Sequence, residues 1–384
     1  MRVLALNAGS STIKAAVYEV GSASKDGDRA SPAEWAGAVP MNDGAIDEFL
    51  RAQHDAAHGA IDVIGHRIVH GGAELTASTI LDSGVHDAIA RVAEYAPLHN
   101  RVALDIVDRA TRIFGESMPQ VAVFDTAFHA TLPAEAYAYA GPFVWLEQGL
   151  RKYGFHGISH RYASRRAARI LGAGARRIVT CHLGSGCSLA AVHDGVSVDT
   201  TMGMTPTDGV PMATRSGSVD PGLLIHLLRS GANTTDSLDD LLNHHAGLAG
   251  LSGTDGDMRV VLAAVAAGSE RARLAFDVYI RRIAQGVATM SAAMNGIDAL
   301  AFTGGTGEHA PQVRSAICAR LDFLGIDLDV ALNAACVADE VISASRSRVG
   351  VVLVGAEENW CIAQDCWRVL ASRTPSGQRG AASG

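Results

Sequence analysis

The sequence lacks several features that would place the protein in a membrane or on nucleic acid. No apolar run approaches the roughly 20 residues that a membrane-spanning helix needs. Met1 leads directly into a predicted strand, so we expect no signal peptide. Positive charge is also in deficit, because a net charge of −8 argues against general binding to nucleic acid or to anionic membranes. We therefore expect no nucleic-acid partner and no membrane association.

Two familiar sequence motifs are absent as well. The 6 cysteines include no Cys-x-x-Cys pair, which favours free thiols in a reducing cytoplasm. No segment matches Gly-x-x-x-x-Gly-Lys-Ser/Thr, which excludes the P-loop class of nucleotide-binding proteins. The chain does have 384 residues, of which 48% are hydrophobic and 41 are glycine. These values are typical of a compact α/β protein with about two domains and many tight turns.

One pattern occurs twice in the chain. Residues 3–17 and 178–192 are each an apolar run, a turn of small residues and a second apolar run, which predicts a β-hairpin. Aligned without gaps, the copies pair Asn7 with His182, Gly9 with Gly184 and Ser10 with Ser185. Small residues let backbone N–H groups approach an anion closely. The repeat therefore indicates a duplicated, two-lobed protein that binds phosphate groups, such as a nucleotide phosphotransferase.

The repeat also suggests how the chain is divided. We place a first lobe at residues 1–152 and a second lobe at residues 153–355. A C-terminal helix at about residues 356–370 is expected to pack back on the first lobe. Residues 371–384 look like a disordered tail.

Two charged residues lie at or near the ends of predicted strands in the first lobe. Arg67 lies in an apolar strand, where its charge is costly unless it is paired or faces a ligand. A structural salt bridge remains the alternative. Asp125 comes directly after the short strand 120–124, a common location for active-site residues in α/β folds.

The second lobe contains three further segments that indicate function. His156 and His160 have a metal-pair spacing, but no Glu lies between them and Gly157 follows His156, so zinc is not expected. Residues 205–220 form a long segment without periodicity, and such segments are usually functional; Arg215 lies in its polar part. Residues 303–307 follow a strand and precede a helix, the context for a nucleotide contact.

These segments match, in order, the motifs of a known family. The matching motifs are Leu6–Lys14, Gly65–Gly72, Pro97–Asn100, Phe124–His129, Tyr153–His160, His182–Gly186, Thr214–Gly217, Phe302–Glu308 and Glu357-Glu358. The chain therefore resembles the acetate/propionate/butyrate kinase family over about residues 3–365. The resemblance implies the duplicated acetate and sugar kinase/heat-shock cognate/actin (ribonuclease H-like) fold, which would account for the repeat.

The resemblance also implies roles for individual residues. It implies Mg²⁺, or Mn²⁺ in its place, held by Asn7 and Glu357, with Asp125 close to the metal and the reacting groups. Its catalytic cations correspond to Arg67, His156 and Arg215. Its apolar pocket for the acyl methyl group corresponds to Val69, Leu98, Phe155 and Pro206. Its nucleotide and phosphate contacts correspond to Lys14, His182, Gly184, Ser185, Gly186, Asp257, Met258, Arg259, Gly305, Thr306, Gly307 and His309.

Elementary electrostatics agrees with these roles. A carboxylate that approaches a polyphosphate about 4 Å away is repelled by a few kcal/mol at a partly screened dielectric. Cationic side chains and Mg²⁺ offset that repulsion and neutralise charge on the transferred phosphoryl group. Acetate is already ionised at pH 7, so no general base is needed. We therefore interpret Asp125 as organising the metal or Arg67.

Three positions depart from the family's common pattern. Ser185 stands where Asn is common, His309 replaces the Asn of a Gly-Glu-Asn sequence, and Arg101 stands where Pro is usual. Ser185 keeps a hydroxyl donor but lacks the reach of an amide, so it bears on nucleotide contacts and on the choice of phosphoryl donor.

The leading prediction is reversible phosphoryl transfer from ATP to acetate, giving acetyl phosphate and ADP. Propionate or another short acid is an alternative acceptor, because one methylene changes discrimination by only about 1–3 kcal/mol. A second alternative is a non-catalytic nucleotide switch of the actin or chaperone type, against which the three cations count. The family also implies a homodimer.

Overall fold

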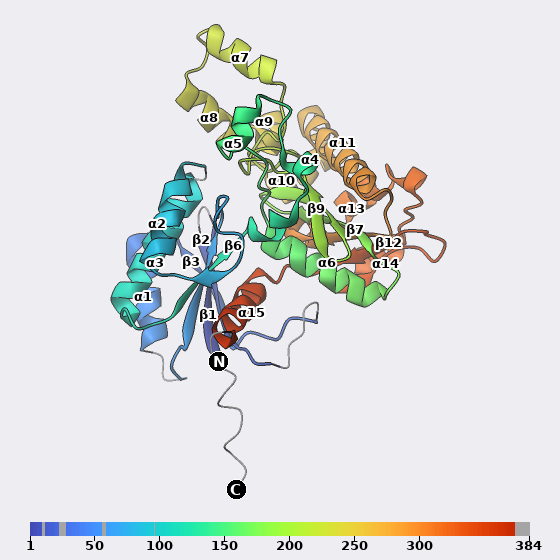
Figure 1. Cartoon of the computed structure of the whole chain (residues 1–384). Helices are drawn as coiled ribbons and strands as arrows, with labels where there is room; N and C mark the ends of the chain where they lie inside the picture. The colour runs from blue at the N-terminus through green and yellow to red at the C-terminus, as the bar shows by residue number, and fades with distance from the viewer. Residues whose placement is uncertain (10–11, 23–27, 56–58, 96, 373–384) are drawn as a thin grey trace. The chain divides into compact units, whose positions relative to one another are not determined.

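The computed structural model describes residues 1–9, 12–22, 28–55, 59–95 and 97–372 (Figure 1). The chain forms two compact units. Unit 1 comprises Met1–Ala127 together with Glu357–Gly384, and unit 2 comprises Phe128–Ala356. The sequence-based expectation places the division at residues 152 and 153, whereas these units divide between Ala127 and Phe128. Most of the expected tail, from residue 373 onward, lies outside the described residues.

Unit 1 is built on a six-stranded sheet with the order β3-β2-β1-β4-β6-β5. The strands are β1 (Arg2–Ala8), β2 (Thr12–Glu19), β3 (Trp35–Pro40), β4 (Val63–Ile68), β5 (Thr79–Ile80) and β6 (Gln120–Phe124). Strands β1, β2 and β3 are joined antiparallel, while β4 is parallel to both β1 and β6. The parallel strands are buried along nearly their whole length, as expected for a sheet with helices on both faces.

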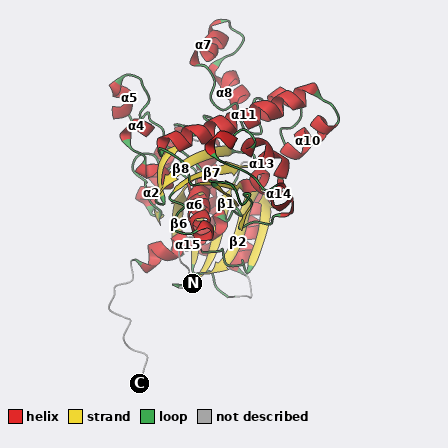
Figure 2. Ribbon diagram, turned by 90° about the vertical axis from the view of Figure 1, so that its right-hand side faces the viewer, coloured by secondary structure: helices red, strands yellow, loops and turns green. Residues whose placement is uncertain are grey.

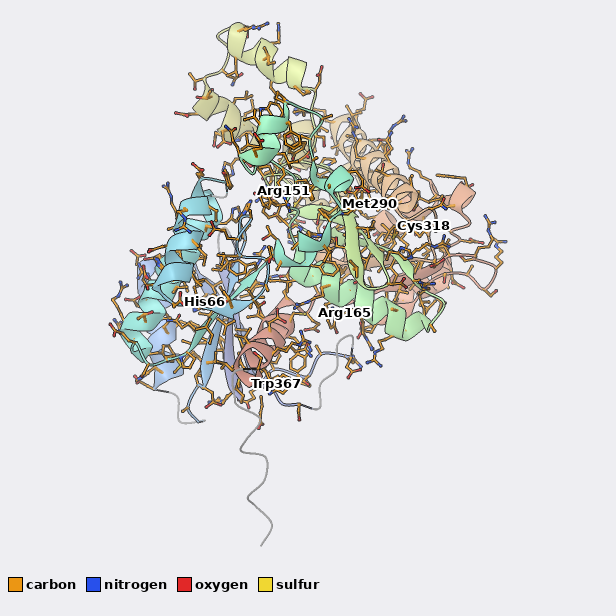
Figure 3. All side chains as sticks on the ribbon, in the orientation of Figure 1. His66, Arg151, Arg165, Met290, Cys318 and Trp367 are labelled. Carbon is orange, nitrogen blue, oxygen red and sulfur yellow. The ribbon has the colours of Figure 1, made fainter. Side chains whose placement is uncertain are left out.

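The helices of unit 1 come from both ends of the chain. They are α1 (Asp43–His54), α2 (Ser83–Arg91), α3 (Pro97–Phe114) and α15 (Glu358–Ala371), with the short 3₁₀ helix η1 (Val92–Tyr95). Helix α15 packs on β1 and β4. A Cβ atom at Gly65 would lie 2.5 Å from Cys366 Sγ and 2.6 Å from Ile362 Cγ2, so glycine permits this close packing. On the same strand lies His66, which is labelled in Figure 3. Its Nε2 is 2.7 Å from Gln120 Oε1.

Unit 2 repeats the strand arrangement of unit 1. Its sheet has the order β11-β12-β10-β7-β8-β9. The strands are β7 (Arg177–Leu183), β8 (Cys187–His193), β9 (Val196–Thr200), β10 (Ala299–Thr303), β11 (Glu340–Val341) and β12 (Gly350–Leu353). The antiparallel β7, β8 and β9 correspond to β1, β2 and β3, and the parallel β10 and β12 correspond to β4 and β6. The two copies of the repeated sequence are the hairpins β1–β2 and β7–β8, so the duplication is confirmed.

The helices of unit 2 are numerous, and Figure 2 separates them from the strands by colour. They are α4 (Ala134–Tyr137), α5 (Phe143–Glu147), α6 (Gly157–Leu171), α7 (Pro221–Arg229), α8 (Thr235–His244), α9 (Gly247–Ser252), α10 (Met258–Ala266), α11 (Glu270–Ala293), α12 (Gly304–His309), α13 (Pro311–Cys318) and α14 (Val330–Ala335), with 3₁₀ helices η2 (Ala127–Thr131) and η3 (Asp322–Leu324).

Helices α6 and α11 cover opposite faces of the unit 2 sheet (Figures 1 and 2). Adjacent residues of β8 show this arrangement, because side chains alternate between the faces of a strand. Ser188 contacts His160 on α6, whereas Cys187 contacts Tyr279 on α11. The face under α6 is polar as well as buried, and it carries much of the candidate site.

Candidate active site

An ion pair between Arg67 and Asp125 lies at the ends of two neighbouring parallel strands in unit 1. Arg67 is in β4, and Asp125 follows the last residue of β6. The Nε and Nη2 groups of Arg67 donate to Asp125 Oδ2 at 2.9 and 2.5 Å. Burial alone would lower the pKa of Arg67, but the carboxylates of Asp125 and Glu358 raise it above its ordinary value. The guanidinium therefore remains charged at this position.

Asn7 extends this cluster at the end of β1. Its Oδ1 accepts from Arg67 Nη1 at 3.3 Å, and its Nδ2 donates to Glu358 Oε2 at 2.7 Å. Glu358 is the first residue of α15, and Glu357 is the N-cap residue of the same helix. The sequence motif contains both residues, but only Glu357 is assigned a role from the sequence. The available signal was the position of both acidic residues at the start of a helix, where carboxylates are favoured.

Three further predicted residues lie in unit 1. Lys14 is exposed on β2 and pairs with Asn7 across the ladder. Val69 is buried and directly follows β4. Leu98 lies in the first turn of α3, and the structure does not describe its side chain. The buried Asn100 holds the segment after Val69, because its amide exchanges hydrogen bonds with the backbone N–H and C=O of His70.

In unit 2, His156 has an unusual backbone conformation at the start of α6. Its φ of 57° lies in the left-handed region, which costs a residue other than glycine on the order of 1–3 kcal/mol. Such strain persists where the surrounding structure holds it, and it is common at functional sites. The imidazole stacks on His182 with a centroid distance of 4.3 Å, and its Nδ1 lies 2.9 Å from Ser188 Oγ.

His156 and Arg215 come together beside Gly186. A Cβ atom at Gly186 would lie 3.2 Å from His156 Nε2 and 3.7 Å from Arg215 Nη1. Arg215 belongs to the irregular segment 201–220, which is joined to the β7–β8 turn by a hydrogen bond from Ala213 N to Ser185 O at 3.1 Å. The absence of a side chain at Gly186 leaves both cation-forming groups next to bare backbone. This arrangement suits an anionic ligand.

The predicted apolar residues of unit 2 border the same segments. Pro206 O accepts from Arg215 Nη1 at 3.4 Å. Phe155 is buried, and its carbonyl oxygen accepts from His129 Nε2 at 3.1 Å. Burial lowers the pKa of His129 to about 4, so its ring is neutral.

The two predicted phosphate-binding segments of unit 2 end neighbouring parallel strands. His182 in β7 pairs with Thr303 in β10. A Cβ atom at Gly184 would lie 3.7 Å from His182 Nε2 and 4.0 Å from Gly305 N. The loops 182–186 and 303–307 are therefore adjacent, as a nucleotide site requires. Ser185 lies in the first loop, and Thr306, Gly307 and His309 lie in α12.

A buried arginine that sequence reasoning missed fixes the second of these loops. Arg314 donates from Nη1 to the carbonyl oxygens of Gly307 and Glu308 at 2.7 and 2.8 Å. Its Nε and Nη2 donate to the side chain and backbone of Asn333, both at 2.7 Å. Burial lowers the pKa of Arg314 below its ordinary value. The only sequence signal was an arginine within the apolar face of a predicted helix.

The remaining predicted nucleotide contacts form the start of α10. Asp257 is its N-cap and accepts from Arg259 N at 2.8 Å and from Arg259 Nη2 at 2.5 Å. Met258 is buried, and the Arg259 side chain is exposed. Within the described chain, no group of three or more His, Cys, Asp and Glu residues forms a metal site.

Comparison with known proteins gives consistent results along the chain. Residues 30–364 match the sequence model described as the Acetokinase family. The acetate kinase of Nostoc punctiforme is 43% identical over 405 residues, covering 96% of this chain and 100% of the relative. The acetate kinase of Porphyromonas gingivalis has a crystal structure with a TM-score of 0.84 and 36% identity, covering 96% of this chain and 99% of that one. The propionate kinase of Francisella tularensis subsp. tularensis has a TM-score of 0.85 and 34% identity, covering 95% and 98%.

These matches confirm the resemblance that the ordered motifs predicted, and they confirm the duplicated α/β fold. They disfavour a non-catalytic nucleotide switch and support an enzyme that transfers a phosphoryl group to a carboxyl group. The chain belongs to the acetokinase family.

Proposed function

We propose that the protein catalyses reversible phosphoryl transfer from ATP to the carboxylate of acetate, giving acetyl phosphate and ADP. The observation that carries this proposal is the approach of His156 Nε2 and Arg215 Nη1 to the same backbone position, Gly186. Two such groups beside bare backbone suit the charge that spreads over the equatorial oxygens of a transferred phosphoryl group. A carboxylate oxygen attacks the γ-phosphorus as the bond to the bridging oxygen of ADP breaks.

Arg67 and Asp125 are proposed to serve the acceptor side of this reaction. The carboxylate of acetate needs no proton removed at pH 7, so Asp125 does not act as a general base. Its bond to two N–H groups of Arg67 instead fixes the plane of the guanidinium. Because Nη1 donates to Asn7 Oδ1 and to Ala8 O, the second N–H group of Nη2 is proposed to bind the acetate carboxylate. Val69, Leu98, Phe155 and Pro206 are proposed to surround the methyl group.

The oxygen-donor groups of unit 1 fit Mg²⁺. Carboxylate and amide oxygens are its preferred protein ligands, and one or two carboxylates with substrate phosphates are the usual set. We propose that Asn7 and Glu357 hold the ion, with Asp125 nearby, and that Mn²⁺ can replace it. When bound, the ion neutralises phosphate charge. In this proposal Glu358 does not coordinate the ion. It orients the Asn7 amide by accepting a hydrogen bond from Nδ2.

The nucleotide is proposed to bind the two adjacent loops of unit 2 and the start of α10. The residues concerned are His182, Gly184, Ser185, Gly186, Asp257, Met258, Arg259, Gly305, Thr306, Gly307 and His309. Lys14 is proposed to contact the transferred phosphate.

We also propose that the protein is a cytoplasmic homodimer. Helix α7 leaves large apolar side chains in solvent, with Leu223 and Ile225 both 47% exposed. Exposed apolar residues on one short helix favour association with a second copy. Light scattering of the purified protein, with Ile225→Asp as the disrupting variant, tests this.

No helix among the described residues is both long and apolar enough to cross a bilayer.

A coupled assay of ADP formation tests the proposed reaction. Acetate, propionate and butyrate are the acceptors, and ATP, GTP and pyrophosphate are the donors. We expect the highest kcat/KM with ATP and acetate. Preference for propionate would replace the acceptor in the proposal, and no acid-dependent turnover with any donor would contradict the reaction itself.

The role of Arg215 is tested separately. Arg215→Ala should lower kcat by roughly 10³-fold, as loss of a transition-state arginine does. Arg215→Lys should restore little of it, because an ammonium lacks the planar fork. Arg273→Ala, at an exposed position on α11, is the matched control. An effect on KM alone would assign Arg215 to ground-state binding.

A further inference from the structure

A buried chain of hydrogen bonds runs from His156 into the interior of unit 2. His156 Nδ1 lies 2.9 Å from Ser188 Oγ. Ser188 Oγ also lies 2.7 Å from His160 Nε2, and His160 Nδ1 lies 2.7 Å from Thr180 Oγ1. The two histidines belong to the α6 segment, Ser188 belongs to β8 and Thr180 belongs to β7. His160, Ser188 and Thr180 are all fully buried, so water does not compete for these bonds.

Because Ser188 has a single hydroxyl proton, the position of the ring proton in His156 is linked to its position in His160. Ser188 donates to one ring nitrogen and accepts from the other. His160 is neutral, because burial and the neighbouring His129 and His182 lower its pKa well below the ordinary value. A neutral ring has one N–H group and one bare nitrogen. The direction of every bond in the chain is therefore set by the direction of any one of them.

Thr180 selects between the two possible directions. If its hydroxyl donates to His160 Nδ1, then His160 Nε2–H donates to Ser188, and Ser188 donates to the bare Nδ1 of His156. All bonds in this order are 2.7–2.9 Å long. In the reverse order the Thr180 hydroxyl must donate to Ala190 O at 3.5 Å. That distance is at the outer limit for a hydrogen bond, so the first order is favoured.

We propose that Ser188, supported by His160 and Thr180, is a positioning residue that holds His156 as the tautomer with its proton on Nε2. This inference rests on the proposed role of His156 beside Arg215. With Nε2 protonated, a neutral imidazole presents an N–H group to an anionic oxygen near Gly186. The donor is then available whether or not the ring also carries a positive charge. His156 and His160, whose i,i+4 spacing resembles that of a metal-binding pair, are thus members of one hydrogen-bond chain.

The charged and titratable groups around His156 come from three elements. His182 of β7 stacks on it, and Ser159 Oγ lies 2.8 Å from His182 Nδ1. His160 of α6 reaches it through Ser188, and Arg215 of the segment 201–220 lies on the Nε2 side. His129 contacts the far side of His160, with ring centroids 5.7 Å apart.

Substitution of Thr180 tests the chain without touching His156. Thr180→Val keeps the shape of the side chain but removes the proton that orders the chain. We expect kcat to fall roughly 10-fold or more, with KM for acetate and ATP little changed, in the range found for groups that orient a functional histidine. The loss of kcat should be larger at high pH, where a neutral ring can place its proton on Nδ1, than at low pH, where an imidazolium carries a proton on both nitrogens. Thr180→Ser should restore the wild-type pH profile.

Ser188→Ala should give the same growing loss at high pH. Ser164→Ala is the control, since that buried serine of α6 donates to the backbone oxygen of Arg161. A uniform loss of kcat at all pH values in both Thr180→Val and Ser188→Ala would overturn the proposal in favour of a purely structural role.

The tautomer can be observed directly in the full-length protein. In protein labelled with ¹⁵N-histidine, two-dimensional NMR at pH 8 distinguishes a protonated ring nitrogen from a bare one. The His156 signals are assigned by their loss in His156→Gln. We expect protonated Nε2 and bare Nδ1, and the opposite pattern overturns the proposal. If His156→Gln instead retains full turnover, the proposed role of His156 fails while the tautomer result stands, so the two failures are distinguishable.

Discussion

Two N–H groups of Arg67 converge on a single carboxylate oxygen of Asp125, Oδ2. Asp125 is only 1% exposed, so this pair is held in an environment of low dielectric. Removing one member of a buried pair leaves the other charge uncompensated. The pair therefore stabilises unit 1, and it is also proposed to orient the acetate that accepts the phosphoryl group.

Substituting Asp125 with a neutral residue of the same size tests what its charge contributes. Asp125→Asn keeps the side-chain volume and leaves the guanidinium without its anionic partner. We expect the free energy of unfolding to fall by about 3 kcal/mol and kcat to fall at least 10-fold. Urea unfolding and steady-state kinetics are the measurements. Asp194→Asn breaks an exposed pair with Arg176 and should change stability by less than about 1 kcal/mol. Near-normal turnover in Asp125→Asn would show that the charge is dispensable.

The adjacent acidic residues Glu357 and Glu358 should differ in their effect on the metal requirement. Glu357→Gln removes a proposed ligand, and we expect the Mg²⁺ concentration for half-maximal activity to rise by more than about 10-fold. Glu358→Gln changes a group that orients the Asn7 amide, and its effect should be smaller, since the amide of glutamine can still accept from Nδ2. Titration with Mg²⁺ and Mn²⁺ at saturating ATP measures both variants. The reverse ranking would make Glu358 the ligand.

Arg314 should control nucleotide affinity through the carbonyl oxygens it binds. Arg314→Ala removes the donor that binds the backbone oxygens of Gly307 and Glu308. A buried acceptor left without a hydrogen-bond partner lowers the stability of the loop by about 1–3 kcal/mol. We expect KM for ATP to rise about 10-fold, with KM for acetate unchanged. The exposed Arg320→Ala is the control. Equal changes in both KM values would mean that the variant disturbs unit 2 as a whole.

Much of the fold follows from local sequence patterns. The hairpin pattern, which occurs twice, predicts the antiparallel pairs β1–β2 and β7–β8, because each copy contains the two apolar runs and the small-residue turn that form antiparallel neighbours. The turn at Asp194-Gly195 joins β8 to β9, with φ values of 52° and 79° that suit these residue types. The end of a strand likewise indicates Asp125 as a site residue. Such features depend on residues close in sequence.

The contacts that complete the candidate site depend on packing between distant segments. Ser188 is 32 residues from His156 and 28 from His160, and it meets both only because α6 packs on β7. Glu358 reaches Asn7 across 351 residues because α15 packs on β1. Arg314 meets Asn333, 19 residues away, because α13 packs on α14. No local pattern predicts these pairings, since each residue alone is equally consistent with an ordinary core or surface position.

Buried neutral histidines should make the protein lose stability in mild acid. Burial lowers the pKa of His66 and of His129 to about 4, and it lowers the pKa of His160 well below its ordinary 6.5. Above pH 6.5 these rings are neutral in both the folded and the unfolded chain and contribute no pH dependence. Between about pH 6.5 and 4 the unfolded chain binds protons that the folded chain does not, so the free energy of unfolding falls as pH falls. Each histidine contributes on the order of 1 kcal/mol per pH unit.

Urea unfolding at pH 8, 6 and 5 measures this slope. His66→Gln removes one of the three groups, so its stability should fall less steeply between pH 6.5 and 5 than that of the wild type. His193→Gln, which alters a ring that is 43% exposed, is the control. Carboxylates paired with arginine act in a separate window, because the Arg177 guanidinium holds the pKa of Asp298 below its ordinary 3.8. The stability that these carboxylates contribute is lost only in stronger acid, so it does not affect the slope between pH 6.5 and 5. A slope in His66→Gln equal to that of the wild type would therefore show that His66 takes up a proton in the folded protein.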